Sequence, residues 1–134
     1  MSPIVKTHRD LLAWQKGMAL TKAVYEATKA FPKEELFGLT SQIRRAAVSV
    51  PANIAEGSGR GSTKEFLQFL VIARGSLAEL ETLLLLAKGL SMVSGEAFAK
   101  LEVLISEISA LIGGLIASLR RRSACQSTPM TRSH

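Results

Sequence analysis

The stretch that decides the fold is QIRRAAVSVPANIAEGSGRGSTKEF, which runs from Gln42 to Phe66. It begins with the apolar spacing of a helix, contains a proline at position 51, and then becomes a loop of glycine, serine and arginine. A proline inside a helix removes one backbone hydrogen bond and clashes with the carbonyl four residues earlier. The apolar stripe nevertheless keeps its helical phase through Pro51, so we predict one kinked helix from about residue 32 to Gly57. We expect Ser49 to bond either the carbonyl that the proline frees or a nearby one.

Three other segments also have the periodicity of amphipathic helices. In two of them, a residue pair at the start has the spacing of a capping box, namely Thr7 with Asp10 and Ser62 with Glu65. Ser94 is a candidate cap for the last helix. The boundaries expected for these three helices are residues 9–30, 62–89 and 96–121.

The lengths of these segments and the short turns between them favour a helical bundle. No segment shows the period of two that is typical of strands. We therefore predict an all-α protein whose residues 1–122 form an antiparallel up-down-up-down four-helix bundle with a proline-kinked second helix. Residues 123–134 are expected to be a disordered polar tail.

The third predicted helix is apolar on more than one side. Its main stripe is accompanied by a second apolar set, which faces other directions: Leu67, Val71, Ile72, Leu83, Leu85 and Leu86. A helix that is apolar nearly all round is normally buried on several sides. One bundle leaves part of each helix in water, so this surplus predicts self-association.

The chain of 134 residues has 17 basic and 11 acidic residues, and its formal net charge is +6. This charge favours a polyanionic partner such as RNA or DNA, while the alternative is that it only keeps the protein soluble. The basic excess lies mainly in residues 1–30, with five basic and two acidic residues, and in residues 91–134, with five and three.

Several classes of function lack their usual residues. Cys125 is the single cysteine, which is typical of a protein of the reducing cytoplasm. His8 and His134 stand near opposite ends of the chain, so we expect no metal site and no cofactor. The charge-free apolar run 108–119 is shorter than the roughly 20 residues that span a bilayer, so we expect no membrane partner.

The glycine loop GSGRGSTK, from Gly57 to Lys64, superficially resembles a phosphate-binding P-loop. The match fails, because that motif needs Lys before Ser or Thr and a strand before the loop. A weaker interpretation is that backbone N–H groups at the start of the next helix bind a phosphate together with Arg60 and Lys64. The alternative is a simple capped turn.

A polar stripe on the second helix comprises Arg45, Ser49, Asn53 and Glu56. It contains no nucleophile with a base and no metal ligand set, so we expect no catalytic residues and no enzyme activity. It is interpreted as a hydrogen-bonded seam that braces the proline or meets a neighbouring subunit, with a binding patch as the alternative. The arginines at 120–122 are explained either by the helix dipole or by nucleic-acid binding.

The chain resembles the four-helix-bundle family encoded in intervening sequences of bacterial 23S rRNA genes. The resemblance rests on an Arg-Arg-Ala-Ala run at 44–47, on Ser49 and Pro51, on Asn-Ile-Ala-Glu-Gly at 53–57 and on the segment 73–79. It covers nearly the whole chain up to about Arg122. The accessory variability determinant of diversity-generating retroelements is similar to this family in fold.

The resemblance implies a homopentamer without a catalytic site, which binds nucleic acid or a nucleic-acid enzyme such as a reverse transcriptase through a basic surface. The alternative is a purely structural or protein-interaction oligomer. The candidate nucleic-acid-binding residues are Arg44, Arg45, Arg60, Lys64, Arg120, Arg121 and Arg122. The candidate structural motif is Ser49, Pro51, Asn53, Glu56 and Gly57.

Overall fold

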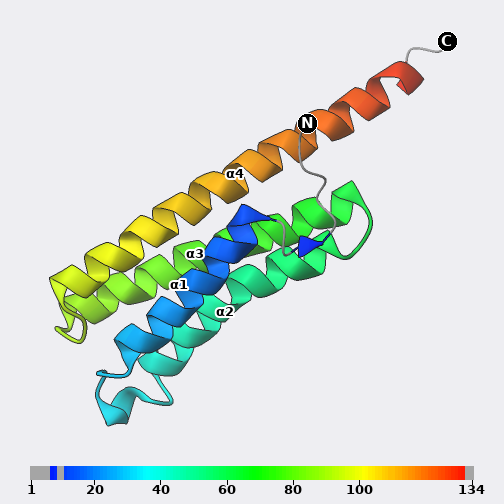
Figure 1. Ribbon diagram of the computed structural model, residues 1–134. Helices are drawn as coiled ribbons and strands as arrows, with labels where there is room; N and C mark the ends of the chain where they lie inside the picture. Colours follow the sequence, from blue (N-terminus) through cyan, green and yellow to red (C-terminus); the bar gives the residue numbers. More distant parts are fainter. Residues whose placement is uncertain (1–6, 9–10, 132–134) are drawn as a thin grey trace.

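A computed structural model describes residues 7, 8 and 11–131 of the chain, with side chains as far as Ala124. Within that part the protein is all-helical and has no strand. Figure 1 shows the elements in order: α1 (Leu12–Thr28), a 3-10 turn η2 (Lys33–Glu35), α2 (Leu39–Ser58), α3 (Thr63–Gly89) and α4 (Gly95–Thr131).

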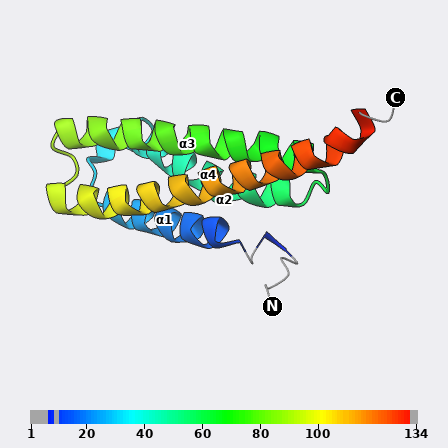
Figure 2. The same cartoon turned by 90° about the horizontal axis from the view of Figure 1, so that it is seen from above.

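The four helices pack side by side, and each one contacts two others. Helix α2 lies against α1 and α3, while α4 lies against α3 and α1. The end of α4 extends beyond the other three helices, as both views show (Figures 1 and 2). A surface ion pair joins α1 to α4, with Lys16 Nζ 3.2 Å from Glu107 Oε2.

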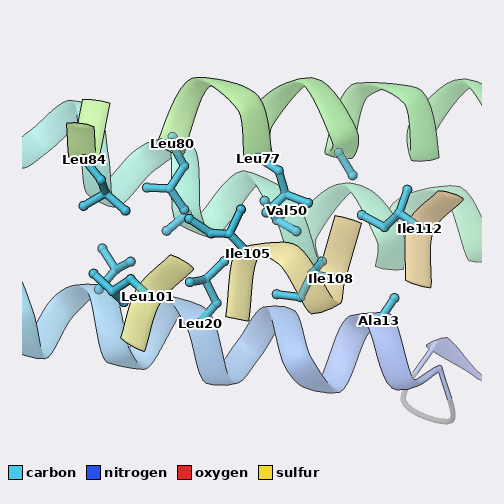
Figure 3. Close-up of a cluster of buried hydrophobic side chains, with 14 of the residues drawn as sticks. Ala13, Leu20, Val50, Leu77, Leu80, Leu84, Leu101, Ile105, Ile108 and Ile112 are labelled. Atoms are coloured by element: carbon cyan, nitrogen blue, oxygen red, sulfur yellow. The ribbon is translucent and has the colours of Figure 1, made fainter. Parts of the chain in front are cut away.

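The core is a continuous apolar cluster to which all four helices contribute (Figure 3). Because helical side chains three and four apart share a face, each helix presents one stripe to this cluster. The largest fully buried side chains are Leu20, Val24, Ile43, Val50, Ile54, Leu70, Leu80, Leu84, Ile108 and Ile112. The predicted core stripes of the first, third and fourth helices are confirmed at these positions.

The start of the first helix differs from the prediction. Helix α1 begins at Leu12, and its N-cap, Leu11, has extended backbone and makes no side-chain capping hydrogen bond. Asp10, one half of the expected capping box, lies outside the described residues.

The second helix was predicted to begin near Pro32 but begins at Leu39. Glu34 and Glu35 instead lie in η2, and the non-helical backbone of Gly38 separates this turn from α2. The Glu35 carboxylate still serves the helix start, because its Oε1 accepts a hydrogen bond from the Leu39 N–H at 3.2 Å. Helix α2 continues through Pro51 as predicted, whereas the kink itself stays a prediction.

The predicted caps of the last two helices are confirmed. The Ser62 Oγ accepts from the Glu65 N–H at 3.1 Å, and Ser94 Oγ accepts from the Ala97 N–H at 3.1 Å. Helix α4 runs from Gly95 to Thr131, past the end that was expected near Arg121. No glycine or proline stands between Gly114 and Pro129, so nothing in the local sequence stops the helix after the three arginines.

Candidate nucleic-acid interface

Pro51 is buried and faces Gly17 of α1. A Cβ atom built on Gly17 would lie 3.3 Å from Cβ and 3.4 Å from Cδ of the proline ring. Gly17 is itself buried. The absence of a side chain at Gly17 therefore makes room for the ring, and Pro51 acts as a packing residue between α1 and α2.

A residue of α1 also repairs the backbone bond that Pro51 removes. In a regular helix the amide of residue 51 would donate to the carbonyl of Ala47, and proline has no such amide. The Thr21 hydroxyl lies 3.1 Å from Ala47 O and 2.9 Å from its own helix carbonyl, Gly17 O. Thr21 thus donates to the freed carbonyl, which was one of the two bonds expected for Ser49.

Ser49 and Asn53 instead form a polar seam between α2 and α3. The hydroxyls of Ser49 and Ser76 are 2.8 Å apart, and Asn53 Nδ2 donates to Ser49 Oγ at 2.8 Å and to Ser49 O at 2.7 Å. These bonds satisfy partly buried polar groups inside one chain. Ser49 therefore makes a structural contact between α2 and α3.

Gly57 and Glu56 hold the turn between α2 and α3. A Cβ on Gly57 would lie only 2.6 Å from Phe69 Cβ, so the close approach of the two helices requires glycine. Glu56 Oε2 accepts from Arg60 Nη2 at 2.6 Å, and the Arg60 guanidinium also lies over the Phe69 ring, 4.9 Å from its centroid. Arg60 is therefore occupied by contacts within the turn.

Arg44 and Arg45 have different surroundings although they are adjacent. Arg44 Nε donates to Thr28 Oγ1 at 2.9 Å, and its guanidinium lies 4.7 Å from the centroid of the Tyr25 ring. Arg45 is exposed and makes no ion pair with any described residue. Arg44 is thus held against α1, whereas Arg45 lies on the surface.

The remaining candidate cations gather at the α2–α3 turn and the adjoining part of α4. Arg122 lines a cavity of about 390 Å³ together with Ser58, Ser62 and Phe66. Lys64, Arg120, Arg121 and Arg122 are exposed, and none of them has an ion-pair partner among the described residues. We call these four residues the basic end. The sequence did not show that the glycine loop and Arg122 face the same cavity.

The outer face of α3 is apolar and uncovered. It comprises four residues on the side of the helix opposite its core stripe, each 41–52% exposed: Val71, Ile72, Leu85 and Leu86. A shallow apolar hollow of about 420 Å³ lies at its end, between Leu86 and Leu90. Of the second apolar set predicted on this helix, Leu83 is buried in the core and Leu67 packs against it, so only part of that set is left for a partner.

Two carboxylates meet between α3 and α4. Partial burial raises the pKa of Glu102 above its ordinary value, a hydrogen bond and repulsion from Glu81 raise it further, and Lys88 lowers it. Across the described part of the chain, no group of three His, Cys, Asp or Glu residues is placed to hold a metal ion. The Glu81–Glu102 pair therefore destabilises the contact between α3 and α4 when both carboxylates are charged.

By length and composition alone, the segment Gly95–Ala124 of α4 is apolar enough to cross a membrane. Only 28% of this apolar window is buried, and α4 packs against α1 and α3 through a buried stripe. The charge-free run 108–119, from which no membrane span was expected, is only part of this segment.

The sequence did not show that Gly17, Thr21 and Ser76 are the partners of the α2 motif, although Ser76 lies in the segment 73–79 that carries the family resemblance. The available signal was the spacing of Gly17 and Thr21, which places a gap and a hydroxyl on consecutive turns of one helix face. Which face meets Pro51 depends on how α1 packs, and the sequence of α1 does not contain that information.

Comparison with known proteins gives the chain a family. A search of curated proteins found no significant match. The model of the 23S rRNA-intervening sequence protein family matches residues 9–114, a range that includes α1, α2, α3 and the first half of α4. The chain therefore belongs to the 23S rRNA-intervening sequence protein family.

Proposed function

We propose that this protein is a non-enzymatic, oligomeric binding module that contacts nucleic acid, or a nucleic-acid enzyme such as a reverse transcriptase, through a basic surface. The observation that carries the proposal is the basic end, where four exposed cations have no acidic partner among the described residues. Cations in such clusters attract phosphates and release condensed counterions when they bind.

The outer face of α3 supports the oligomeric part of the proposal. Surfaces of this apolarity are commonly sites of protein association. A pentamer, which the family resemblance suggests, would carry about five times the charge of one chain and would strengthen the field around the basic end. In this proposal the helices form an up-down-up-down bundle with α2 kinked at Pro51, and the protein acts in the cytoplasm without a membrane partner.

A second candidate is an oligomer that binds other proteins and has no role with nucleic acid. It is favoured by the positions of Arg44 and Arg60, two of the seven cations that the sequence selected, because both make contacts within the chain. In that case the net charge of +6 serves solubility.

The test is a binding titration of labelled single-stranded RNA and DNA over a series of salt concentrations. The proposal predicts that log Kd rises linearly with log salt. Replacing Arg120, Arg121 and Arg122 together by Gln should reduce the slope by about 2 to 3, since each lost phosphate contact removes a little under one counterion. Replacing the exposed residues Lys22, Lys88 and Lys100 by Gln is the matched control for net charge.

The two candidates predict different outcomes. Equal losses in the arginine variant and the lysine control would mean that binding depends on net charge and not on the basic end. No retention of either nucleic acid at low salt, from a protein that is still oligomeric, would leave the structural oligomer as the better description.

A further inference from the structure

A second cavity lies where the end of α1 and the turn η2 meet the first turn of α2. Its volume is about 250 Å³, several times the roughly 30 Å³ that a water molecule occupies in the liquid. Lys29, Lys33, Arg44 and Thr40 line it, with Phe31 and Pro32 forming part of an apolar wall. We call it the α1–α2 cavity.

The lining of the α1–α2 cavity is cationic and includes no acidic residue. Arg44 uses Nε to hold Thr28, but its terminal Nη groups make no hydrogen bond within the described residues. Lys33 has no ion pair there either, and Lys29 pairs only with Glu26 in an exposed contact of 3.1 Å, which water screens. Three cations thus line a cavity that has no acidic side chain in its lining, and the nearby Glu35 carboxylate is engaged by the Leu39 N–H.

Thr40 is the most unusual residue of the cavity. It is only 3% exposed, and its Oγ1 is the one buried side-chain polar atom without a hydrogen-bond partner among the described residues. A hydroxyl inside a helix normally bonds the carbonyl four residues earlier, and a buried polar group left unpaired destabilises the fold. An acceptor from outside the chain would remove that cost.

The helix terminus adds to the attraction for an anion. Thr40 is the second residue of α2, a helix of 20 residues, so it lies at the positive end of the helix dipole. The Glu35 carboxylate accepts from the Leu39 N–H. The Thr40 amide lies in the first turn of α2, so it has no intrahelical acceptor. The apolar wall keeps the local dielectric low, which strengthens each of these interactions.

We propose that the α1–α2 cavity binds a phosphate group. Its oxygens accept from Arg44 and, once the Thr40 side chain rotates to bring its hydroxyl into the cavity, from Thr40, while Lys33 and Lys29 balance its charge. The phosphate comes either from the backbone of a nucleic acid or from free phosphate and small phosphate esters. The inference deepens the proposed function and rests on it for the nucleic-acid source alone.

The experiment is a ¹⁵N NMR titration of the full chain near neutral pH with sodium phosphate, against sodium chloride at the same ionic strength. Phosphate should move the amide signals of Thr40 and Ser41 in a saturable way. Thr40→Val should weaken binding about tenfold, because a hydrogen bond to a charged group contributes about 1.5–3 kcal/mol. Lys33→Gln, a change at an exposed residue, should weaken it severalfold.

Thr82→Val and Lys22→Gln are the matched controls, because both residues lie outside the cavity. The Thr82 hydroxyl is exposed on α3 and donates to the Ala78 carbonyl. Both should bind phosphate like the unmodified protein. No saturable shift at Thr40, or equal affinities of the unmodified protein, Thr40→Val and Lys33→Gln, would overturn the inference.

A second titration with oligothymidine that lacks terminal phosphates distinguishes the two sources. A shift at Thr40 that inorganic phosphate competes away assigns the site to the nucleic-acid backbone. Phosphate binding without any binding of oligothymidine supports the inference and contradicts the nucleic-acid function. If oligothymidine binds in a salt-dependent way that Thr40→Val does not change, and phosphate does not bind in the cavity, the inference is contradicted and the nucleic-acid function is supported.

Discussion

The Thr21 hydroxyl of α1 bonds the carbonyl of Ala47 on α2, at 3.1 Å, in place of the amide that Pro51 lacks. A proline inside a helix is thus matched by a hydroxyl from the neighbouring helix. The same turn of α1 contains Gly17, whose missing side chain leaves room for the proline ring. The family motif on α2 is therefore completed by residues of α1 outside that motif.

Thr21→Val is expected to lower the free energy of unfolding by about 1–2 kcal/mol, because it leaves the Ala47 carbonyl without this donor. In a Pro51→Ala background the loss should be smaller by at least about 0.5 kcal/mol, since the new backbone amide at position 51 can take over the bond. Urea denaturation of the four proteins of this cycle measures the coupling. Thr82→Val is the control, and equal losses in both backgrounds would refute the repair.

The change in stability on replacing a helical glycine by alanine should depend on whether another helix lies close to that glycine. Gly57→Ala is expected to lower stability by about 1–3 kcal/mol, because its Cβ would meet the Phe69 Cβ at 2.6 Å. Gly17→Ala should cost less, since the contact with Pro51 would be 3.3 Å. Gly114→Ala, with no atom within 4 Å, should gain about 0.5–1 kcal/mol from helix propensity. The denaturant midpoint should be lowest for Gly57→Ala, higher for Gly17→Ala and highest for Gly114→Ala. The reverse order would contradict the packing of α2.

The Glu81–Glu102 contact predicts a pH dependence of stability. A glutamate whose pKa is raised in the folded protein contributes stability at acid pH, and that contribution is lost as the pH rises from the ordinary value of 4.5 through the raised one. Glu102→Gln should therefore raise the melting temperature at neutral pH and change it little at pH values below 4.5.

Because these carboxylates are partly exposed, the gain should be no more than about 1 kcal/mol. Thermal melts of both proteins across this pH range measure it, with Glu79→Gln as the control on the exposed side of α3. A melting-temperature difference between Glu102→Gln and the unmodified protein that is the same at all pH values would argue against the pair.

Removing apolar surface from the outer face of α3 should weaken self-association. Ile72→Ser and Leu86→Ser replace residues that are 50% and 52% exposed, so each should change the stability of one chain by no more than about 0.5 kcal/mol. Light scattering should show a smaller particle than for the unmodified protein. Val103→Ser on α4, at a residue 60% exposed, is the control. An unmodified protein of 14.4 kDa at micromolar concentration would rule out association through this face.

Local signals predicted the helices where they were strong. The capping pairs at Ser62 and Ser94 place the starts of α3 and α4, because a cap depends only on residues three positions apart. The starts of α1 and α2 were predicted wrongly. At Gly38 the chain leaves the helical region although the apolar period continues, so periodicity alone placed the helix seven residues too early.

The candidate site was predicted in part. From the sequence, Ser49, Pro51, Asn53 and Gly57 were predicted to form a structural motif, since a proline in helical phase needs a partner. In the structure Ser49, Pro51 and Gly57 contact neighbouring helices, and Asn53 bonds Ser49. The sequence could not separate Arg60, which is held by Glu56, from Lys64, which is exposed. It also passed over Thr40, because burial without a hydrogen bond is a property of the packed protein.

By itself the sequence determined the all-helical class, the continuous helix through Pro51 and the excess of positive charge. These follow from spacing along the chain and from composition, which need no knowledge of neighbours. Only the tertiary structure decided that Thr21 serves the Ala47 carbonyl, that Arg122 faces the glycine loop, and that Thr40 lies unpaired among three cations. The physical reason is that each of these relationships joins residues from different helices, and the rotation of a helix about its axis is set by the packing of the whole core.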